Sequence, residues 1–228
     1  MFEILLLDLD DTILDFAATE RKGMIRLLEY IGVQPTEEVL HRYHVINLRH
    51  WEMLEKGQLT REQLGPSRFA VLFSELGITA DPLQCQALYR QYLSEGDDVL
   101  PGAREALERL RGRYRLFAAT NSSVYVQNGR LARTGLRPCF ENVFVSEELG
   151  ADKPSEAFFC RCFAQIEGFR KEKAMMVGDS LTSDILGGNN AGIATCWINP
   201  KHRPRREGIR VDHEIETLSQ LPVLLETL

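Results

Sequence analysis

A run of four apolar residues near the start of the chain, ending in acidic residues, is the feature that most constrains the fold. Residues 4–7 read Ile-Leu-Leu-Leu, and Asp8, Asp10 and Asp11 follow within four positions. An apolar run this short and continuous is typical of a strand that is buried on both faces of a parallel sheet. In open α/β sheets, ligands bind at the edge formed by the carboxyl ends of the strands. We therefore expect Asp8 and Asp10 at that edge.

An acidic cluster at the end of a buried strand indicates a bound cation. Carboxylates placed close together repel one another, and each is costly to remove from water. A cation relieves both costs, and carboxylate and water ligands suit Mg²⁺ better than softer metals. The pattern therefore predicts metal-assisted chemistry.

Composition narrows the class of protein. The chain has 228 residues, of which 44% are hydrophobic and 26% charged, as in ordinary soluble globular proteins. A net charge of −6 argues against a nucleic acid as the main partner. No apolar run approaches the ~20 residues of a membrane span, and the first residues do not resemble a signal peptide. The five cysteines are scattered and odd in number, so we expect free thiols and a cytoplasmic location.

The segment 16–95 has helical patterns throughout and no strand pattern. From Met24 to Ile31, for example, apolar residues recur at the spacing of one helical face. We expect this segment to form an α-helical cap. It would be inserted into a discontinuous core made of residues 1–15 and 96–228, and it would cover the carboxyl edge of the sheet because it leaves the core there.

Beyond residue 96, short apolar runs alternate with helical segments. The runs that we expect to be strands span 116–119, 143–145, 174–177 and 194–198. The segments of helical pattern that separate most of them are 124–134, 155–167 and 181–191. Strands that alternate with helices predict a doubly wound parallel sheet. The predicted fold class is therefore an α/β protein with a Rossmann-like core and an inserted helical cap.

Polar residues follow the predicted strands at positions that would meet at one edge. They are Asp8, Asp10, Thr120, Asn121, Lys153, Asp179 and Asp184. Carboxylates, one lysine, one hydroxyl group and the N-termini of helices can together bind Mg²⁺ and a phosphate.

Four motifs in this order resemble those of the haloacid-dehalogenase-like hydrolases. The motifs are Asp8-Leu9-Asp10-Asp11-Thr12, Thr120-Asn121, Lys153-Pro154 and Gly178-Asp179-Ser180-Leu181-Thr182-Ser183-Asp184. Any one of them is weak evidence, whereas four in order, each near a predicted strand end, are specific. The helical insertion after the first motif is similar to the helical cap of that superfamily.

The resemblance implies a phosphatase that acts by two-step phosphoryl transfer. Asp8 would attack the phosphorus and form an aspartyl-phosphate. Asp10 would protonate the leaving oxygen and then activate the water that cleaves the intermediate. Mg²⁺ would be held by the Asp8 carboxylate, the backbone carbonyl of Asp10 and Asp179.

The resemblance also assigns residues to the phosphate group. Thr120, the backbone amide of Asn121 and Lys153 would hold it, and Asp184 would orient Lys153 or a metal-bound water. One position departs from the pattern, because many relatives have glycine where this chain has Ser122. If that position requires a positive φ angle, serine costs about 1 kcal/mol or more.

Other segments resemble the helical-capped pyrimidine 5′-nucleotidases. They include Arg133-Thr134-Gly135-Leu136, Val145-Ser146-Glu147-Glu148-Leu149-Gly150 and Ser183-Asp184-Ile185-Leu186-Gly187-Gly188. This resemblance implies a nucleoside 5′-monophosphate as substrate, with pyrimidines preferred. Asn47 and Trp51 in the cap would then be candidates to contact the base, as aromatic rings stack on exposed bases.

Three alternatives remain at this point. A dehalogenase would use the same nucleophile without Mg²⁺, although Asp10 and Asp179 argue for phosphate chemistry. The N-acylneuraminate-9-phosphatases share much of the last motif, so the substrate could be a sugar phosphate or another small phosphorylated metabolite, such as phosphoglycolate. A non-catalytic binding protein on the same fold is the alternative of a different class. It predicts the loss of at least one site residue, and none is lost.

Overall fold

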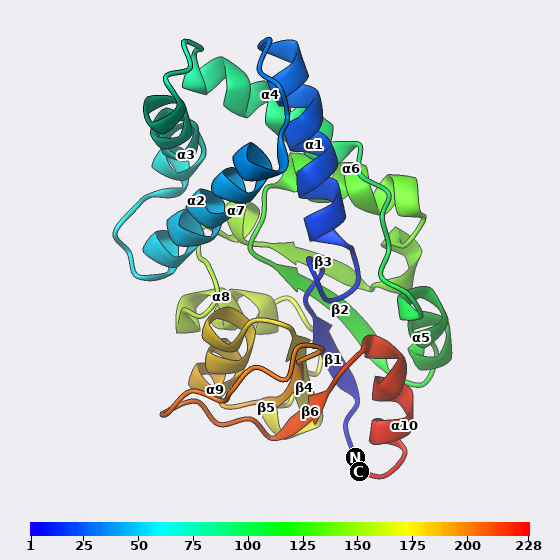
Figure 1. Cartoon of the computed structure of the whole chain (residues 1–228). Coiled ribbons are helices and arrows are strands. Elements are labelled where there is room, and N and C mark those ends of the chain that lie inside the picture. Colours follow the sequence, from blue (N-terminus) through cyan, green and yellow to red (C-terminus); the bar gives the residue numbers. More distant parts are fainter.

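The computed structural model describes all 228 residues as two lobes, a core built on a sheet and a helical cap above it (Figure 1). The six strands are parallel and lie in the order β3-β2-β1-β4-β5-β6. Their bounds are β1 (Ile4–Leu7), β2 (Arg115–Thr120), β3 (Asn142–Val145), β4 (Ala174–Gly178), β5 (Ala194–Ile198) and β6 (His213–Ile215). The predicted parallel α/β sheet is confirmed. Its strand order reverses between β1 and β4, which is where open α/β sheets bind ligands.

Strand β1 lies at the centre of the sheet and is buried on both faces. Leu5 and Leu7 belong to one hydrophobic cluster, whereas Ile4 and Leu6 belong to another. Successive side chains of a strand point to opposite faces, so this alternation separates the two clusters. The sheet is therefore covered by helices on both sides, as the continuous apolar run predicted.

The helices of the core cover the two faces of the sheet unequally. The first cluster includes residues of α5, α6 and α10, and the second includes residues of α8 and α9. The core helices are α5 (Ala103–Leu110), α6 (Val124–Thr134), α7 (Ser146–Leu149), α8 (Glu156–Phe163), α9 (Leu186–Ala191) and α10 (Leu221–Leu225). Three 3₁₀ turns, η1 (Arg137–Cys139), η2 (Lys171–Lys173) and η4 (Leu218–Gln220), and one π-helical turn, η3 (Leu181–Ile185), complete the core.

The cap consists of four helices with a hydrophobic core of their own. They are α1 (Phe16–Tyr30), α2 (Glu37–Glu55), α3 (Arg61–Leu76) and α4 (Pro82–Ser94). Their shared cluster contains the stacked or edge-on rings of Tyr43, Phe69 and Tyr89. Thr60 begins α3 with a capping box, and Gly77 ends it in the left-handed conformation that glycine favours. The predicted absence of strands in this segment is confirmed.

The two connections between core and cap run side by side. The Asp15 amide donates a hydrogen bond to the carbonyl of Asp98 (3.1 Å), and Leu14 forms an isolated bridge with Val99. The helical region begins one residue after Asp15 and ends at Ser94. We therefore propose 16–95 as the cap and residues 1–15 and 96–228 as the core.

Several elements differ from the sequence-based expectations. The predicted helix 155–167 ends at Phe163, and the predicted helix 181–191 begins with the π-helical turn η3. The first strand covers Ile4–Leu7, the apolar run itself. Strand β6 and helices α7 and α10 were not predicted, because each has only three to five residues and too short a pattern to recognise.

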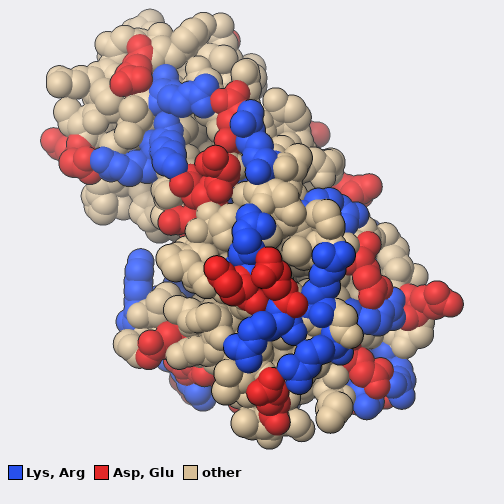
Figure 2. Space-filling view, turned by 90° about the vertical axis from the view of Figure 1, so that its right-hand side faces the viewer, with Lys and Arg blue, Asp and Glu red and all other residues tan.

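The surface carries mixed charge. Figure 2 shows Lys and Arg side chains interspersed with Asp and Glu side chains over the face in view. Many of these charges are paired, as in the exposed pair of Arg115 with Glu141. None of the helices is both long enough and apolar enough to cross a membrane.

Candidate active site

One cavity of about 670 Å³ lies between the cap and the carboxyl edge of the sheet. From the core it is lined by all of the predicted reaction residues, namely Asp8, Asp10, Thr120, Asn121, Lys153, Asp179 and Asp184. From the cap it is lined by both predicted substrate-contacting residues, Asn47 and Trp51. The structure therefore brings every sequence-predicted site residue to one place.

Strand ends deliver most of the core residues to this cavity. Asp8 follows the last residue of β1, Thr120 is the last residue of β2, and Asp179 follows the last residue of β4. Because these three strands are parallel neighbours, their carboxyl ends meet at one edge. Gly178 allows the closest approach there, since a Cβ at this position would lie 2.2 Å from a carboxylate oxygen of Asp184.

Lys153 forms the buried centre of the site. Its Nζ atom donates hydrogen bonds to Asp8 Oδ1, Asp184 Oδ1 and the carbonyl of Ala119, each at 2.6 Å. Burial alone would lower the pKa of Lys153, but the charges of Asp184 and Asp8 outweigh it and raise that pKa. In Asp8, burial raises the pKa well above its ordinary value, and the charge of Lys153 opposes this rise. Lys153 is thus held in its charged form, and its charge favours the ionised form of Asp8 against the effect of burial.

Three carboxylates cluster around this lysine. Oxygen atoms of Asp8, Asp179 and Asp184 all lie within 4.8 Å of one another. Burial and the charge of Asp184 raise the pKa of Asp179 to about 7. Burial and the neighbouring carboxylate thus both disfavour the ionised form of Asp179, and a bound cation would favour it. The cluster could hold a divalent cation that prefers oxygen ligands.

The loop after β2 is braced by its own side chains. Asn121 donates from Nδ2 to the carbonyl of Lys153 (2.8 Å) and accepts at Oδ1 from the Lys153 amide (2.9 Å). The Asn121 side chain therefore ties two loops together, and only its backbone remains to meet a phosphate. Ser122 does not have a positive φ angle, since the only non-glycine residues that do are Asp11 and His202. The predicted cost of serine at this position therefore does not arise.

The carboxylate of Asp10 is held by helix α6. Gln127 Nε2 donates to Asp10 Oδ2 (2.8 Å) and lies 3.2 Å from Thr120 Oγ1, and the guanidinium of Arg130 donates to Asp10 Oδ1. Sequence analysis did not identify Gln127 or Arg130. Their signal was the spacing of two polar residues three apart, on the face of a helix that also carries buried Val126.

The cap wall of the cavity carries a polar network. Asn47 Nδ2 donates to Glu20 Oε1 (2.5 Å), and Asn47 Oδ1 accepts from the guanidinium of Arg68 (2.5 Å). The other oxygen of Glu20 lies 2.6 Å from Nδ1 of His44. Both polar atoms of Asn47 are thus occupied within the cap. The Trp51 ring is half-buried, and the guanidinium of Arg61 lies over it, 6.0 Å from the ring centroid.

Arg61, the first residue of α3, connects the cap to three segments of the core. It donates to the carboxylate of Asp152, to Ser146 Oγ and to the carbonyl of Ser122 (3.1 Å). Asp152 and Ser122 each precede or follow a predicted phosphate-binding residue in the sequence. Arg61 was not recognised from sequence, because nothing in the order of residues indicates a contact over such separations.

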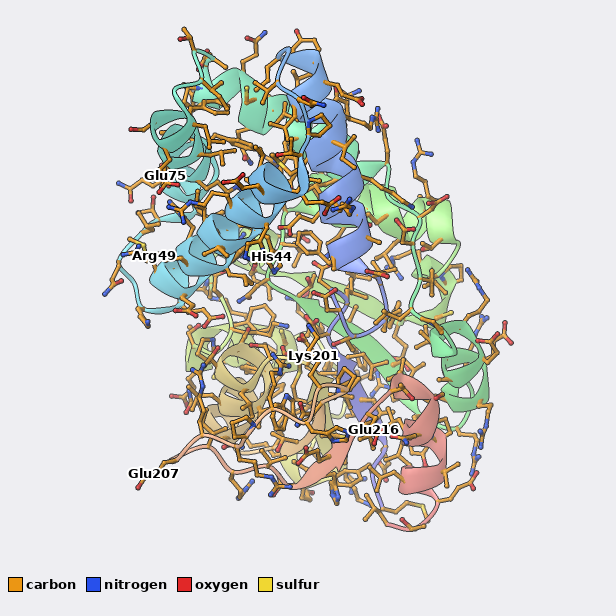
Figure 3. All side chains as sticks on the ribbon, in the orientation of Figure 1. His44, Arg49, Glu75, Lys201, Glu207 and Glu216 are labelled. Carbon is orange, nitrogen blue, oxygen red and sulfur yellow. The ribbon has the colours of Figure 1, made fainter.

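The basic segment after β5 borders the same cavity. Arg203, Arg205 and Arg206 are among its lining residues. Arg203 donates to the carbonyl of Asp179 (2.7 Å), and its guanidinium lies 3.6 Å from that residue's carboxylate. In Figure 3, Lys201 from this segment lies on the core side, below His44 of the cap. The segment therefore adds positive charge at the mouth of the cavity.

Comparison with known proteins agrees with this geometry. The model of the haloacid dehalogenase-like hydrolase family matches residues 2–192. The pyrimidine 5′-nucleotidase PynA of Streptococcus pneumoniae is 40% identical over 96% of this chain and 93% of its own length. The pyrimidine 5′-nucleotidase YjjG of Escherichia coli is 34% identical over 96% of this chain and 95% of its own.

A solved structure is similar over its whole length. The magnesium-bound putative HAD-hydrolase YfnB of Bacillus subtilis has a TM-score of 0.94 and 37% identity, covering 98% of each chain. The protein belongs to the haloacid dehalogenase-like hydrolase family. The resemblance to that family and to its pyrimidine 5′-nucleotidases, predicted from the motifs, is confirmed.

Proposed function

We propose that the protein is a Mg²⁺-dependent phosphatase that cleaves small phosphomonoesters through an aspartyl-phosphate on Asp8. The observation that carries this proposal is the buried unit in which Lys153 Nζ lies 2.6 Å from both Asp8 and Asp184. A buried lysine beside a carboxylate nucleophile can hold it in place and offset the negative charge of an incoming phosphate.

The proposed reaction has two steps. In the first, an oxygen of Asp8 bonds to phosphorus, the ester P–O bond breaks, and Asp10 gives its proton to the leaving oxygen. In the second, Asp10 takes a proton from water, whose oxygen attacks the phosphorus and releases inorganic phosphate and free Asp8. Thr120 and the backbone amide of Asn121 would hold phosphate oxygens during both steps. Asp184 would act through Lys153, because their contact at 2.6 Å fixes the position of Nζ.

The chemistry of the acidic cluster fits Mg²⁺. Asp8 and Asp179 offer carboxylate oxygens, Asp10 offers its backbone carbonyl, and the raised pKa of Asp179 reflects a need for more positive charge. Bound there, Mg²⁺ would neutralise charge that develops on the transferred phosphoryl group. Its binding would also favour the ionised form of the Asp8 nucleophile.

The proposed substrate is a pyrimidine nucleoside 5′-monophosphate. Two relatives with this activity in their names are 40% and 34% identical to the chain over nearly its whole length. A cavity of about 670 Å³ is in the range of small-molecule sites. Trp51 presents an aromatic ring on the cap wall, where a base could stack.

A sugar phosphate that carries a second acidic group is the other candidate substrate. Arg205 and Arg206 also line the cavity and could bind such a group. Relatives named N-acylneuraminate-9-phosphatase, from human and mouse, are 27% and 26% identical over 97% of this chain. The phosphoglycolate-type substrate and a purely binding role have no such support.

A reducing compartment, as in the cytoplasm, is also part of the proposal. All five cysteines are free thiols, and three of them are buried. Buried free cysteines of this kind are small hydrophobic residues in proteins of reducing compartments.

The test is phosphate release from a panel of nucleoside monophosphates and sugar phosphates, with Mg²⁺ and with EDTA, beside the variant Asp8→Asn. Release that requires both Mg²⁺ and Asp8 and is fastest with pyrimidine monophosphates supports the full proposal. If a sugar phosphate is cleaved fastest, the mechanism stands and the nucleotide substrate is wrong. If Asp8→Asn is as active as the natural chain, the proposed mechanism is wrong.

A further inference from the structure

The side chain of Arg130 is fully buried, and its guanidinium touches the proposed acid and base of the reaction. Its relative exposure is 0%, as is that of Gln127, one helical turn earlier on α6. Arg130 Nη1 donates to Asp10 Oδ1, and Gln127 Nε2 donates to Asp10 Oδ2 (2.8 Å). Each oxygen of the Asp10 carboxylate is therefore held by a different residue of the same helix.

Stability does not explain this arrangement. Arginine keeps its charge in proteins, and burying a charge costs several kcal/mol unless the geometry of its partners is excellent. The hydrogen-bonding capacity of these two side chains is not fully used, since Arg130 Nε and Gln127 Oε1 are buried without a hydrogen-bond partner. An apolar pair of similar volume would fill the same space with less desolvation, because buried ion pairs are often no more stable than their apolar replacements.

The arrangement leaves Asp10 able to exchange a proton with the cavity. A carboxylate has about four lone-pair positions, and two of them accept from Arg130 and Gln127. The Asp10 side chain keeps 24% of its surface exposed, and Asp10 lines the cavity. Because these two hydrogen bonds fix the plane of the Asp10 carboxyl group, they also fix the directions of its remaining lone pairs. Asp10 can therefore give or take a proton only along those directions.

The same guanidinium also contacts the connections between core and cap. Arg130 Nη2 lies 3.4 Å from Thr19 Oγ1, and Thr19 lies 3.4 Å from the carboxylate of Asp98 in the second connection. Packing here is close, since a Cβ at Gly129 would lie 2.5 Å from the carbonyl of Ser94 at the end of α4. Arg130 therefore lies where α6 supports both the cap and Asp10.

We propose that Arg130 and Gln127 are positioning residues, which orient the carboxyl group of Asp10 toward the oxygen atom that leaves phosphorus. This inference rests on the proposed function, because it assumes that Asp10 protonates the leaving group. It adds two residues to the machinery that neither the motifs nor the family match assigns a role. Neither residue touches the phosphate in this scheme, and both act through Asp10.

The test compares substrates that differ only in how much they need a general acid. p-Nitrophenyl phosphate and phenyl phosphate have nearly the same size, but nitrophenolate leaves readily without a proton, whereas phenolate gains more from protonation. We expect Arg130→Met and Gln127→Leu to lower kcat/KM for phenyl phosphate about tenfold more than for p-nitrophenyl phosphate, a fraction of the usual contribution of general acid catalysis. kcat/KM is the appropriate quantity because it reports the steps up to departure of the leaving group.

Two further variants separate positioning from general damage. Arg130→Lys keeps the charge but not the planar fork, so it should recover only part of the phenyl phosphate activity. Arg133→Met removes an exposed arginine from the same helix and should leave kcat/KM unchanged for both substrates. Circular dichroism of each variant verifies that it is folded.

The outcomes also distinguish this inference from the proposed function. If the natural chain does not cleave p-nitrophenyl phosphate, or cleaves it equally well after Asp8→Asn, the proposed function fails. If Asp8 is required but Arg130→Met and Gln127→Leu lower kcat/KM by the same factor for both substrates, the positioning role is wrong. An increase in activity in either variant would overturn it as well, because the contacts would then restrain Asp10 from reacting.

Discussion

The two walls of the cavity are built in different ways. On the core wall, Lys153 Nζ joins Asp8, Asp184 and a backbone carbonyl, and all three side chains are buried. On the cap wall, the polar network ends in His44, whose side chain is 45% exposed. The core residues come from strand ends of one sheet, whereas the cap residues come from helices with a separate hydrophobic cluster. The proposed chemistry thus lies on a wall whose central charges are all buried, and the proposed substrate recognition on a wall whose polar network reaches the surface at His44.

The largest expected effect follows from removing the centre of the core wall. Lys153→Met leaves Asp8 and Asp184 buried without their cation, which should cost about 3–5 kcal/mol of unfolding free energy. Phosphate release should fall by at least about a thousandfold, as expected when an electrostatic partner of the reaction is lost. Chemical denaturation and phosphate assays measure the two effects. The exposed Lys171→Met is the control, and equal results for both variants would mean that Lys153 has no special place.

The next effect should come from the contact between the walls. Arg61→Met removes the hydrogen bonds from the cap to Asp152, Ser146 and Ser122. We expect kcat/KM to fall about tenfold, because the segments that carry the proposed phosphate-binding residues lose a fixed support. Steady-state kinetics give the value, with Arg49→Met as control, an exposed arginine of the same cap that is labelled in Figure 3. A fall of the same size in the control would instead indicate a general role of cap charge.

A smaller and more selective effect is expected on the cap wall. Trp51→Leu should lower kcat/KM for uridine 5′-monophosphate about tenfold, because stacking on a base is worth roughly 1–3 kcal/mol. It should leave kcat/KM for p-nitrophenyl phosphate nearly unchanged, since this substrate has no base to stack and the residues of the core wall are intact. Kinetics on both substrates provide the ratio. An equal loss on both would assign Trp51 to cap packing and remove it as a contact to the base.

The smallest effect concerns the pH dependence of the cap. The hydrogen bond with Glu20 raises the pKa of His44 above its usual 6.5, and partial burial opposes this rise. Smaller effects come from the charges of Glu20 and Asp11, which also raise the pKa, and of Lys201, which lowers it. Because the pKa is raised in the folded state, the pair adds stability below about pH 6.5 and loses it as pH rises through the raised value.

The measurement is thermal unfolding of the natural chain and His44→Gln between pH 5.5 and 8.5. The natural chain should be more stable by about 1–2 °C at low pH, with no difference at the upper end. His41→Gln, an exposed histidine of the same helix, is the control. A difference that stays constant over this range would show that His44 contributes by packing alone.

The sequence was sufficient for the parts of the molecule that repeat a simple pattern. The apolar run before Asp8 predicted a strand buried on both faces, because a strand that is covered on one face alone needs apolar residues only at alternate positions. The helical spacing between Met24 and Ile31 predicted the cap in the same way. The core wall followed from these elements, since parallel strands bring their carboxyl ends together whatever their order in the sheet.

Contacts between distant surfaces could not be predicted in this way. Glu20 and Arg68 meet Asn47 only because three helices pack together, and no local pattern encodes that packing. Arg130 is one of several arginines with similar spacing, and its burial depends on α6 lying under the cap. Strand β6 has three residues at the edge of the sheet, too few for any period to appear.

The hydrogen bond from Asp15 to Asp98 has a consequence for how such a protein can change over generations. The amide nitrogen at one end of the cap lies 3.1 Å from the carbonyl oxygen at the other end. The core chain therefore leaves for the cap and returns from it at nearly the same point. An inserted segment of a different length at this point would change the entropic cost of closing the loop only slightly, because that cost grows slowly with loop length. Recombination at this one point could therefore replace the whole cap, to which we assign substrate recognition, and leave the sheet edge with its proposed catalytic residues unchanged.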